Sequence, residues 1–174
     1  WLELVKPDGR VHGEVKTNGA VTGRMTHSNP NMAQVTANGK PWGKECRECW
    51  IAKPGYVLVG VDASGLELRM LAHYMNDAAY TNELLTGDIH TRNQKAAGLE
   101  TRPQAKTFIY AFLYGAGDEK IGSIVGKGAK EGRKLKEEFL GNVPALKELR
   151  EQVSRAAQRG YLFGLDKRKL HIRS

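Results

Sequence analysis

Apolar positions change their spacing along the chain, and this change separates β-prone ends from a long helical middle. The run Tyr56-Val57-Leu58-Val59-Gly60-Val61 is short, apolar and β-branched and follows a Pro-Gly turn, which predicts a buried strand over 56–61. After about residue 66, apolar residues recur at helical spacing, with Gly and Pro between the periodic stretches. We expect helices over 66–77, 79–86, 88–98, 102–115, 118–125, 129–140 and 144–159.

The two ends of the chain carry shorter patterns of β type. Pro-Asp-Gly and Asn-Gly turn signals predict a hairpin or meander over 1–23. Residues 26–44 are polar and are expected to be irregular, with a short helix over 45–51 after them. A strand pair is expected over 161–173. The whole pattern predicts an α+β fold in which a mostly helical region interrupts part of an antiparallel sheet.

The charge of the chain is unevenly distributed. The 174 residues, enough for one domain, hold 27 Lys and Arg against 19 Asp and Glu, a net charge of +8. Residues 1–117 contain 13 basic and 11 acidic side chains, whereas residues 118–174 contain 14 and 8. The excess favours a surface that faces a polyanion, the alternative being a solvated helical surface of mixed sign. No apolar run is long enough to span a bilayer, so no membrane association is expected.

Cys46 and Cys49 form a single Cys-x-x-Cys sequence. A structural zinc site would need two more ligands, and the His residues lie far away in sequence. A redox pair would need a thioredoxin-like βαβ context, which the pattern does not predict. We therefore expect two reduced thiols and a cytoplasmic protein.

Four residues of the predicted helix over 102–115 share one face. Arg102, Lys106, Tyr110 and Tyr114 are spaced by four, which overshoots a helical turn by only about 40°. Two cations near a helix start suit a polyphosphate, because the free N–H groups and the helix dipole also favour anions there. The aromatic rings further along suit a sugar and a base. The alternative is an amphipathic helix whose cations are solvated and whose tyrosines line the core.

Two acidic residues stand at the end of the predicted strand. Asp62 follows the strand directly, and Glu67 falls in the first turn of the next helix. A carboxylate at the tip of a buried strand is a common ligand of a hard metal such as Mg²⁺. The alternatives are that Asp62 caps the helix and that Glu67 complements its dipole.

Five segments in this order resemble a known family. DASGLELR (62–69) resembles motif A of the family A, or Pol I-type, DNA polymerases, and RPQAKTFIYAFLYG (102–115) resembles their motif B. GDIHTRNQ (87–94), TGRMTHSNPNMAQ (22–34) and LDKRKLHIRS (165–174) are similar to further segments of these enzymes. The sequences SGLELR and FLYGAGDEKIG are most similar to those of the replicative polymerases of short-tailed phages.

The resemblance implies a fold and an activity. It implies a DNA-directed DNA polymerase that adds deoxynucleotides to a primer 3′-hydroxyl with two Mg²⁺ ions, and primer–template DNA and dNTPs as its partners. Residues 1–65 would be part of the palm with the motif A strand. Residues 66–160 would be the helical fingers, including the motif B helix 102–115. Residues 161–174 would be a further palm strand segment of an incomplete right-hand fold.

The resemblance also assigns catalytic and triphosphate-binding roles. Asp62 matches the motif A aspartate that ligates both metal ions, and the carbonyl oxygen of Ala63 is a plausible further ligand. Arg102, Lys106 and His90 match groups that contact the triphosphate. Lys106 is also the residue expected to protonate the leaving pyrophosphate.

Further roles concern the sugar and the DNA. Glu67 and Tyr114 match a pair that crowds the sugar 2′ position and excludes ribonucleotides. Tyr110 stands where many bacterial relatives have Phe, which predicts tolerance of dideoxynucleotides. Three residues of the polar segment 22–34 are expected to bind DNA, the first of them by testing the minor groove at the primer terminus: Arg24, Asn31 and Gln34.

One departure from the family concerns the second metal carboxylate, which comes from a His-Asp-Glu motif that this chain does not contain. The Asp118-Glu119 pair follows Gly117 and lies just past the motif B helix. We therefore expect a partial palm with fingers that needs the remaining polymerase segments, thumb and rest of the palm, for activity. The alternative is a non-catalytic nucleotide- or DNA-binding module, which would have no use for a metal aspartate at Asp62.

Overall fold

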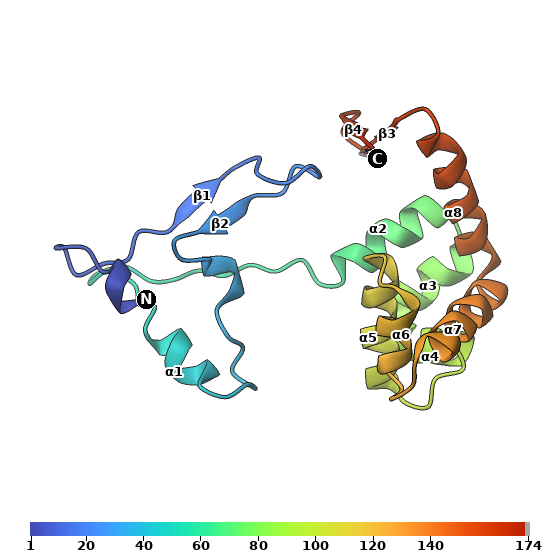
Figure 1. Cartoon of the computed structure of the whole chain (residues 1–174), viewed down its shortest axis with the longest axis horizontal. Helices are drawn as coiled ribbons and strands as arrows, with labels where there is room; N and C mark the ends of the chain where they lie inside the picture. Colours follow the sequence, from blue (N-terminus) through green and yellow to red (C-terminus); the bar gives the residue numbers. More distant parts are fainter. Residues whose placement is uncertain (173–174) are drawn as a thin grey trace. The chain divides into compact units, whose positions relative to one another are not determined.

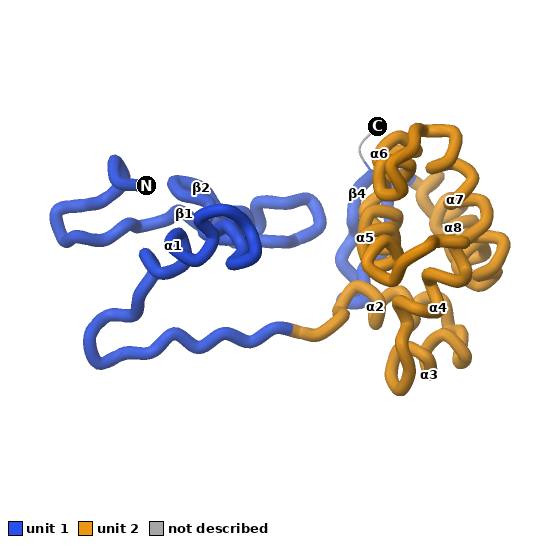
Figure 2. The backbone as a smooth tube through the Cα atoms, turned by 90° about the horizontal axis from the view of Figure 1, so that it is seen from below, with its two compact units in different colours: residues 1–62, 160–174 blue, residues 63–159 orange. Residues whose placement is uncertain are grey.

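The computed structural model describes residues 1–172, so the last two residues of the predicted segment 161–174 lie outside the described residues. The chain forms two compact units (Figure 2). Unit 1 comprises residues 1–62 and the C-terminal stretch from residue 160, and unit 2 comprises residues 63–159. Unit 1 holds two small antiparallel sheets and unit 2 is helical, which confirms the α+β class.

Unit 2 consists of helices packed around one hydrophobic core (Figure 1). Its elements are α2 (Leu66–Met75), α3 (Ala78–Thr86), α4 (Ile89–Ala96), α5 (Arg102–Leu113), α6 (Asp118–Ser123), α7 (Ala129–Asn142) and α8 (Pro144–Ala157). All seven helices predicted over 66–159 are present, with ends that differ from the expected ones by a few residues. Among the described residues, none of the helices combines the length and apolar character that crossing a bilayer requires.

Side chains at the helix starts explain why the chain turns into helix at these points. The carboxylate of Asp77 accepts the N–H of Tyr80 at the start of α3, and that of Asp88 accepts the N–H groups of His90 and Thr91 at the start of α4. Such caps satisfy N–H groups that have no partner within the helix. These caps fix where α3 and α4 begin.

Aromatic side chains join α5 to α7 in the core. Phe108 and Phe139 are fully buried, and their rings meet edge to face at a centroid distance of 5.2 Å. Phe112 lies 5.4 Å from Phe139 and 5.8 Å from Phe108. Burial of such rings is the main source of stability in a domain of this size, and edge-to-face pairs add to it.

Unit 1 has small sheets and little interior. Strand β1 (Glu14–Lys16) pairs antiparallel with β2 (Thr26–Ser28), and β3 (Tyr161–Phe163) pairs with β4 (Lys169–His171). The short elements of this unit are η1 (Leu2–Leu4), η2 (Met32–Gln34) and α1 (Gly43–Glu48). The expected irregularity of 26–44 is therefore wrong at β2. That segment becomes strand because the turn at Asn18-Gly19 folds it back onto β1.

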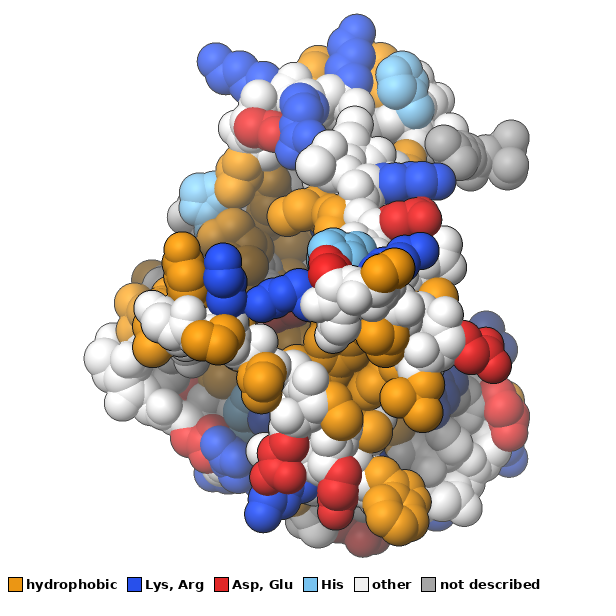
Figure 3. All heavy atoms as spheres, turned by 90° about the vertical axis from the view of Figure 1, so that its left-hand side faces the viewer, with side chains coloured by type: hydrophobic (Ala, Val, Ile, Leu, Met, Phe, Trp, Pro, Cys, Tyr) orange, Lys and Arg blue, Asp and Glu red, His pale blue; other side chains and the backbone are white. Residues whose placement is uncertain are grey.

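The predicted buried strand over 56–61 does not form. Its residues have no strand partner among the described residues, and the exposed fractions of Val57, Val59 and Val61 are 82%, 82% and 95%. A β-prone segment becomes a strand only when a neighbour completes the hydrogen-bond ladder, and the four described strands pair with one another instead. Figure 3 shows hydrophobic side chains, in orange, on one face of the molecule.

Candidate active site

The predicted four-residue face exists on α5. Ala105, Phe108 and Ile109 are buried on one side of the helix, and Arg102, Lys106 and Tyr114 are exposed on another. Tyr110 is half-buried between the two sides. The apolar side anchors the helix in the core, and Tyr110 packs against that core in part. The alternative in which the tyrosines line the core is therefore wrong for Tyr114, which is exposed, and holds in part for Tyr110.

The start of α5 is fixed by a reciprocal pair of hydrogen bonds. The hydroxyl of Thr101 accepts the N–H of Gln104 at 3.3 Å, and the amide oxygen of Gln104 accepts the N–H of Thr101 at 3.1 Å. Pro103 occupies the first turn, where its missing N–H has no consequence. The turn that carries Arg102 is therefore rigidly set.

Arg102 forms a two-pronged ion pair with Asp88. Its Nε donates to Oδ2 of Asp88 at 2.7 Å and its Nη2 donates to Oδ1 at 3.1 Å. The Arg102 guanidinium, together with the hydroxyl of Thr91, holds the pKa of the Asp88 carboxyl far below its usual range. The carboxylate in turn raises the pKa of Arg102. The sequence by itself assigns no role to Asp88, and nothing in the spacing predicts its pairing with a residue of another helix.

His90 lies in the same region, as the second residue of α4. Its Nδ1 is buried and has no hydrogen-bond partner among the described residues. Burial lowers the pKa of His90, Arg102 lowers it further, Asp88 opposes this effect, and Lys106 adds a smaller lowering. Both Arg102 and Lys106 thus lie close enough to His90 for their positive charges to disfavour its protonation. A group of this kind suits an anion with several negative oxygens.

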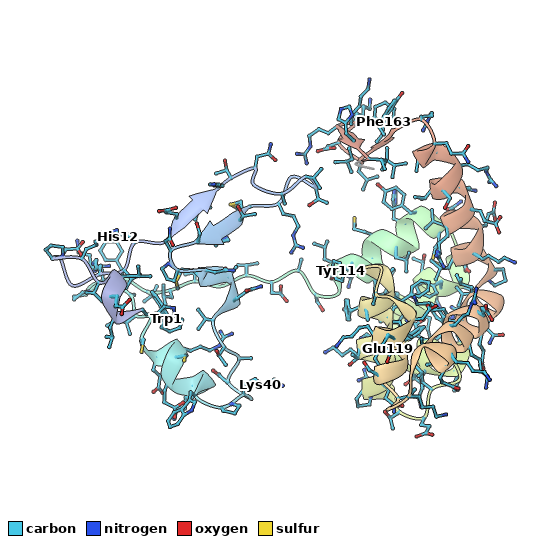
Figure 4. All side chains as sticks on the ribbon, in the orientation of Figure 1. Trp1, His12, Lys40, Tyr114, Glu119 and Phe163 are labelled. Carbon is cyan, nitrogen blue, oxygen red and sulfur yellow. The ribbon has the colours of Figure 1, made fainter. Side chains whose placement is uncertain are left out.

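The other end of α5 carries the second predicted cluster. Tyr114, labelled in Figure 4, donates its hydroxyl proton to Oε1 of Glu67 at 3.0 Å, although the two residues are far apart in sequence. Burial raises the pKa of the Tyr110 hydroxyl, and the neighbouring Glu67 carboxylate and Tyr114 hydroxyl group raise it further. The ring of His90 lies 6.4 Å from that of Tyr110. Six predicted site residues therefore gather in unit 2: Glu67, His90, Arg102, Lys106, Tyr110 and Tyr114.

Lys136 of α7 is a residue of this region that the sequence does not single out. Its Nζ donates to the carbonyl oxygen of Ala116 at 2.6 Å and pairs with Asp118 at 2.8 Å. Asp118 has a lowered pKa for this reason. The contacts fix the turn that follows Tyr114, so α7 stabilises the end of the site-bearing helix.

The predicted metal ligands are exposed. Asp62 is the last residue of the first segment of unit 1, and Ala63 follows it at the start of unit 2. The described residues contain no group of three or more His, Cys, Asp or Glu side chains that could hold a metal ion. These residues fit a metal site only in part, as one carboxylate and one backbone carbonyl.

The predicted DNA-binding residues lie in unit 1, around β2. Arg24 precedes β2, Asn31 caps η2 by accepting the N–H of Ala33, and Gln34 ends η2. All three side chains are exposed. Cys46 is half-buried and Cys49 is exposed, and both thiols are free.

Comparisons with known proteins agree in pointing to one family. A family model described as DNA polymerase family A matches residues 1–174. The chain is 49% identical over 201 residues to the DNA-directed DNA polymerases of Enterobacteria phage T3 and Escherichia phage T7. Each of these matches covers 100% of this chain and 28% of the relative, so the chain spans less than a third of their length.

A bacterial relative and a solved structure extend the comparison. The thermostable DNA polymerase I of Thermus aquaticus is 27% identical over 98% of this chain and 22% of its own length. The POL domain of Pol1 from M. smegmatis, solved in complex with a DNA primer–template and dNTP, matches with a TM-score of 0.79. That match covers 98% of this chain and 32% of the POL domain chain at 22% identity, which shows a shared fold.

Proposed function

The chain belongs to DNA polymerase family A, and on this premise we propose that it is the part of a DNA-directed DNA polymerase that binds the incoming dNTP and carries one metal-binding aspartate. The observation that carries the proposal is the polar face of α5. It presents Arg102 and Lys106 at one end and Tyr114, hydrogen-bonded to Glu67, at the other. This order matches the order of phosphates, sugar and base in a nucleotide.

The residues of this face and their neighbours would each bind a different part of the nucleotide. Arg102 and Lys106 would hold the triphosphate together with His90, whose buried Nδ1 has no other partner among the described residues. Lys106 would then donate a proton to the leaving pyrophosphate, which lowers the charge that builds on its oxygens. Tyr114 and Glu67 would close the space beside the sugar 2′ carbon, so that a 2′-hydroxyl meets a steric and polar obstacle.

Metal binding and DNA binding belong to the neighbouring segments. Divalent metals, Mg²⁺ in this proposal, supply charge neutralisation of the phosphates and activation of the primer 3′-hydroxyl. Asp62 and the Ala63 carbonyl would provide ligands for them. Arg24, Asn31 and Gln34 are exposed around β2 and would contact the primer–template there.

The proposal extends to domain organisation and cellular location. We assign residues 66–160 to the fingers and residues 1–65 and 161–174 to parts of the palm. The remaining polymerase segments, the thumb and the rest of the palm, would complete the catalytic site. A replication enzyme of phage type would act in the cytoplasm of its host.

Primer extension tests the proposal directly. The chain is mixed with Mg²⁺, dNTPs, primer–template DNA and a polypeptide that supplies the His-Asp-Glu palm segment. We expect extension only in the complete mixture, and its loss with Asp62→Asn but not with Asp8→Asn, a matched exposed aspartate of unit 1. Extension by the chain alone would contradict the requirement for a second carboxylate.

A second candidate function is a nucleotide- or DNA-binding module without catalysis. The observation in its favour is that the described residues hold no group of three metal-binding side chains. A complete mixture that stays inactive while the chain still binds dATP through Lys106 would favour this candidate.

A further inference from the structure

Asp88 makes more contacts than a helix cap requires. Its Oδ1 accepts the N–H of His90 at 3.1 Å and its Oδ2 accepts the hydroxyl of Thr91 at 2.8 Å. The same two oxygens accept the two N–H groups of Arg102. The backbone N–H of Asp88 donates to the carboxylate of Glu83 at 2.9 Å. The carboxylate of Asp88 is therefore held by donors from α4 and α5, and its backbone N–H is held by Glu83 of α3.

These contacts fix two groups of the proposed phosphate-binding site relative to each other. Asp88 caps α4 and so sets the position of His90. It also accepts two hydrogen bonds from Arg102, the first residue of α5. Only two of the five N–H groups of Arg102 are used by Asp88, so three remain for another acceptor. Arginine loses much side-chain freedom when it binds an anion, and an arginine that is already held loses less.

We propose that Asp88 is a positioning residue that holds Arg102 beside His90, so that a triphosphate meets an already assembled site. This inference rests on the proposed function and deepens it. Asp88 itself does not touch the nucleotide, because its oxygens are occupied by protein donors and its charge repels phosphate. Its contribution to affinity acts through Arg102.

Two simpler roles of Asp88 predict a different effect of Asp88→Asn on triphosphate binding. If Asp88 were only a cap, Asp88→Asn would leave the affinity for dATP unchanged, since Asn caps helices about as well as Asp. If Asp88 only neutralised Arg102, the same variant would bind triphosphate more tightly, because a competing negative charge is gone. A positioning role predicts weaker binding of triphosphate, because a triphosphate contacts several groups that must be held at fixed positions. It predicts little change in the binding of a single phosphate, which needs fewer such groups.

The test measures the affinity of the full 174-residue chain for dATP with Mg²⁺ and for inorganic orthophosphate, by calorimetric titration. Asp77→Asn is the matched control, because Asp77 caps α3 and its replacement changes the net charge equally. We expect Asp88→Asn to weaken dATP binding about tenfold, with orthophosphate binding within about twofold of the wild type. Asp77→Asn is expected to leave both affinities unchanged.

A double variant shows whether Asp88 acts through Arg102. In an Arg102→Ala background, Asp88→Asn is expected to have no further effect on dATP affinity. Unchanged or tighter dATP binding by Asp88→Asn, or a full additional loss in the Arg102→Ala background, would overturn the positioning role alone. Failure of the wild-type chain to bind dATP would overturn the proposed nucleotide site itself, and the role of Asp88 with it.

Discussion

The crossing of α6 and α7 leaves no room for a methyl group on Gly132. A Cβ at this position would lie 1.9 Å from the carbonyl oxygen of Asp118 and 2.7 Å from the N atom of Gly122. Both atoms belong to the backbone, so no side-chain rotation can relieve the contact. On the other side of the crossing, a Cβ on Gly122 would lie 2.1 Å from the carbonyl oxygen of Gly128. We therefore expect Gly132→Ala to push α6 and α7 apart.

The size of the effect follows from two opposing contributions. Alanine stabilises a helix interior by about 1 kcal/mol relative to glycine. Overpacking costs about 1–3 kcal/mol and occasionally more, and this contact belongs at the upper end, since a carbon–oxygen contact normally needs about 3.3 Å. The free energy of unfolding should thus fall by about 2 kcal/mol. For a domain of about 100 residues this lowers Tm by about 10 °C.

Thermal unfolding followed by far-UV circular dichroism measures this change, because unit 2 contains most of the helix. Gly141→Ala is the matched control. Gly141 lies in the same helix, it is exposed, and a Cβ there meets nothing within 4 Å. We expect this control to keep or slightly raise Tm. Equal Tm values for the two variants would refute the close backbone contact between α6 and α7.

Three further changes probe the site. Glu67→Ala removes the partner of the Tyr114 hydroxyl, and we expect the preference of the chain for dATP over ATP, measured by titration, to fall at least about tenfold. Tyr110→Phe removes a hydroxyl that can replace the contact of a missing sugar 3′-hydroxyl, so binding of ddATP relative to dATP should fall roughly tenfold. Because the pKa of His90 is lowered in the folded chain, the unfolded chain binds more protons, and stability should fall as the pH drops below the ordinary value of 6.5. Denaturant unfolding at several pH values should show this loss in the wild type and in His73→Gln, but a smaller loss in His90→Gln.

The helices and the face of α5 are predictable from the sequence because their signals are local. Helical spacing of apolar residues and the Gly and Pro residues between helices are read within one or two turns, and the caps at Asp77, Asp88 and Thr101 that the structure shows act over the same range. The same holds for Arg102 and Tyr114, whose common face follows from helical geometry alone. Such features need no knowledge of what packs against the helix.

The features that the sequence does not predict all depend on contacts distant in sequence. The pairing of Asp88 with Arg102 joins two helices, and the anchoring of Ala116 by Lys136 joins a turn to α7. The close contact at Gly132 depends on the crossing of two backbones. The run 56–61 has every local property of a buried strand, yet it has no strand partner among the described residues. A local pattern gives the preference of a segment, and its neighbours decide whether the preference is realised.

The distribution of buried residues separates the residues proposed to bind the nucleotide from the aspartate proposed to bind metal. The hydrophobic core of the described residues, from Leu68 to Leu146, lies within unit 2, and so do all the residues proposed to hold the nucleotide. Asp62 instead ends the exposed stretch in which Val61 is 95% accessible to solvent. A side chain on such a stretch has no packed surroundings to hold it at the fixed geometry that metal-assisted transfer needs. Binding of dATP should therefore be a property of unit 2 by itself, whereas the proposed polymerisation would require strand partners that bury residues 56–62.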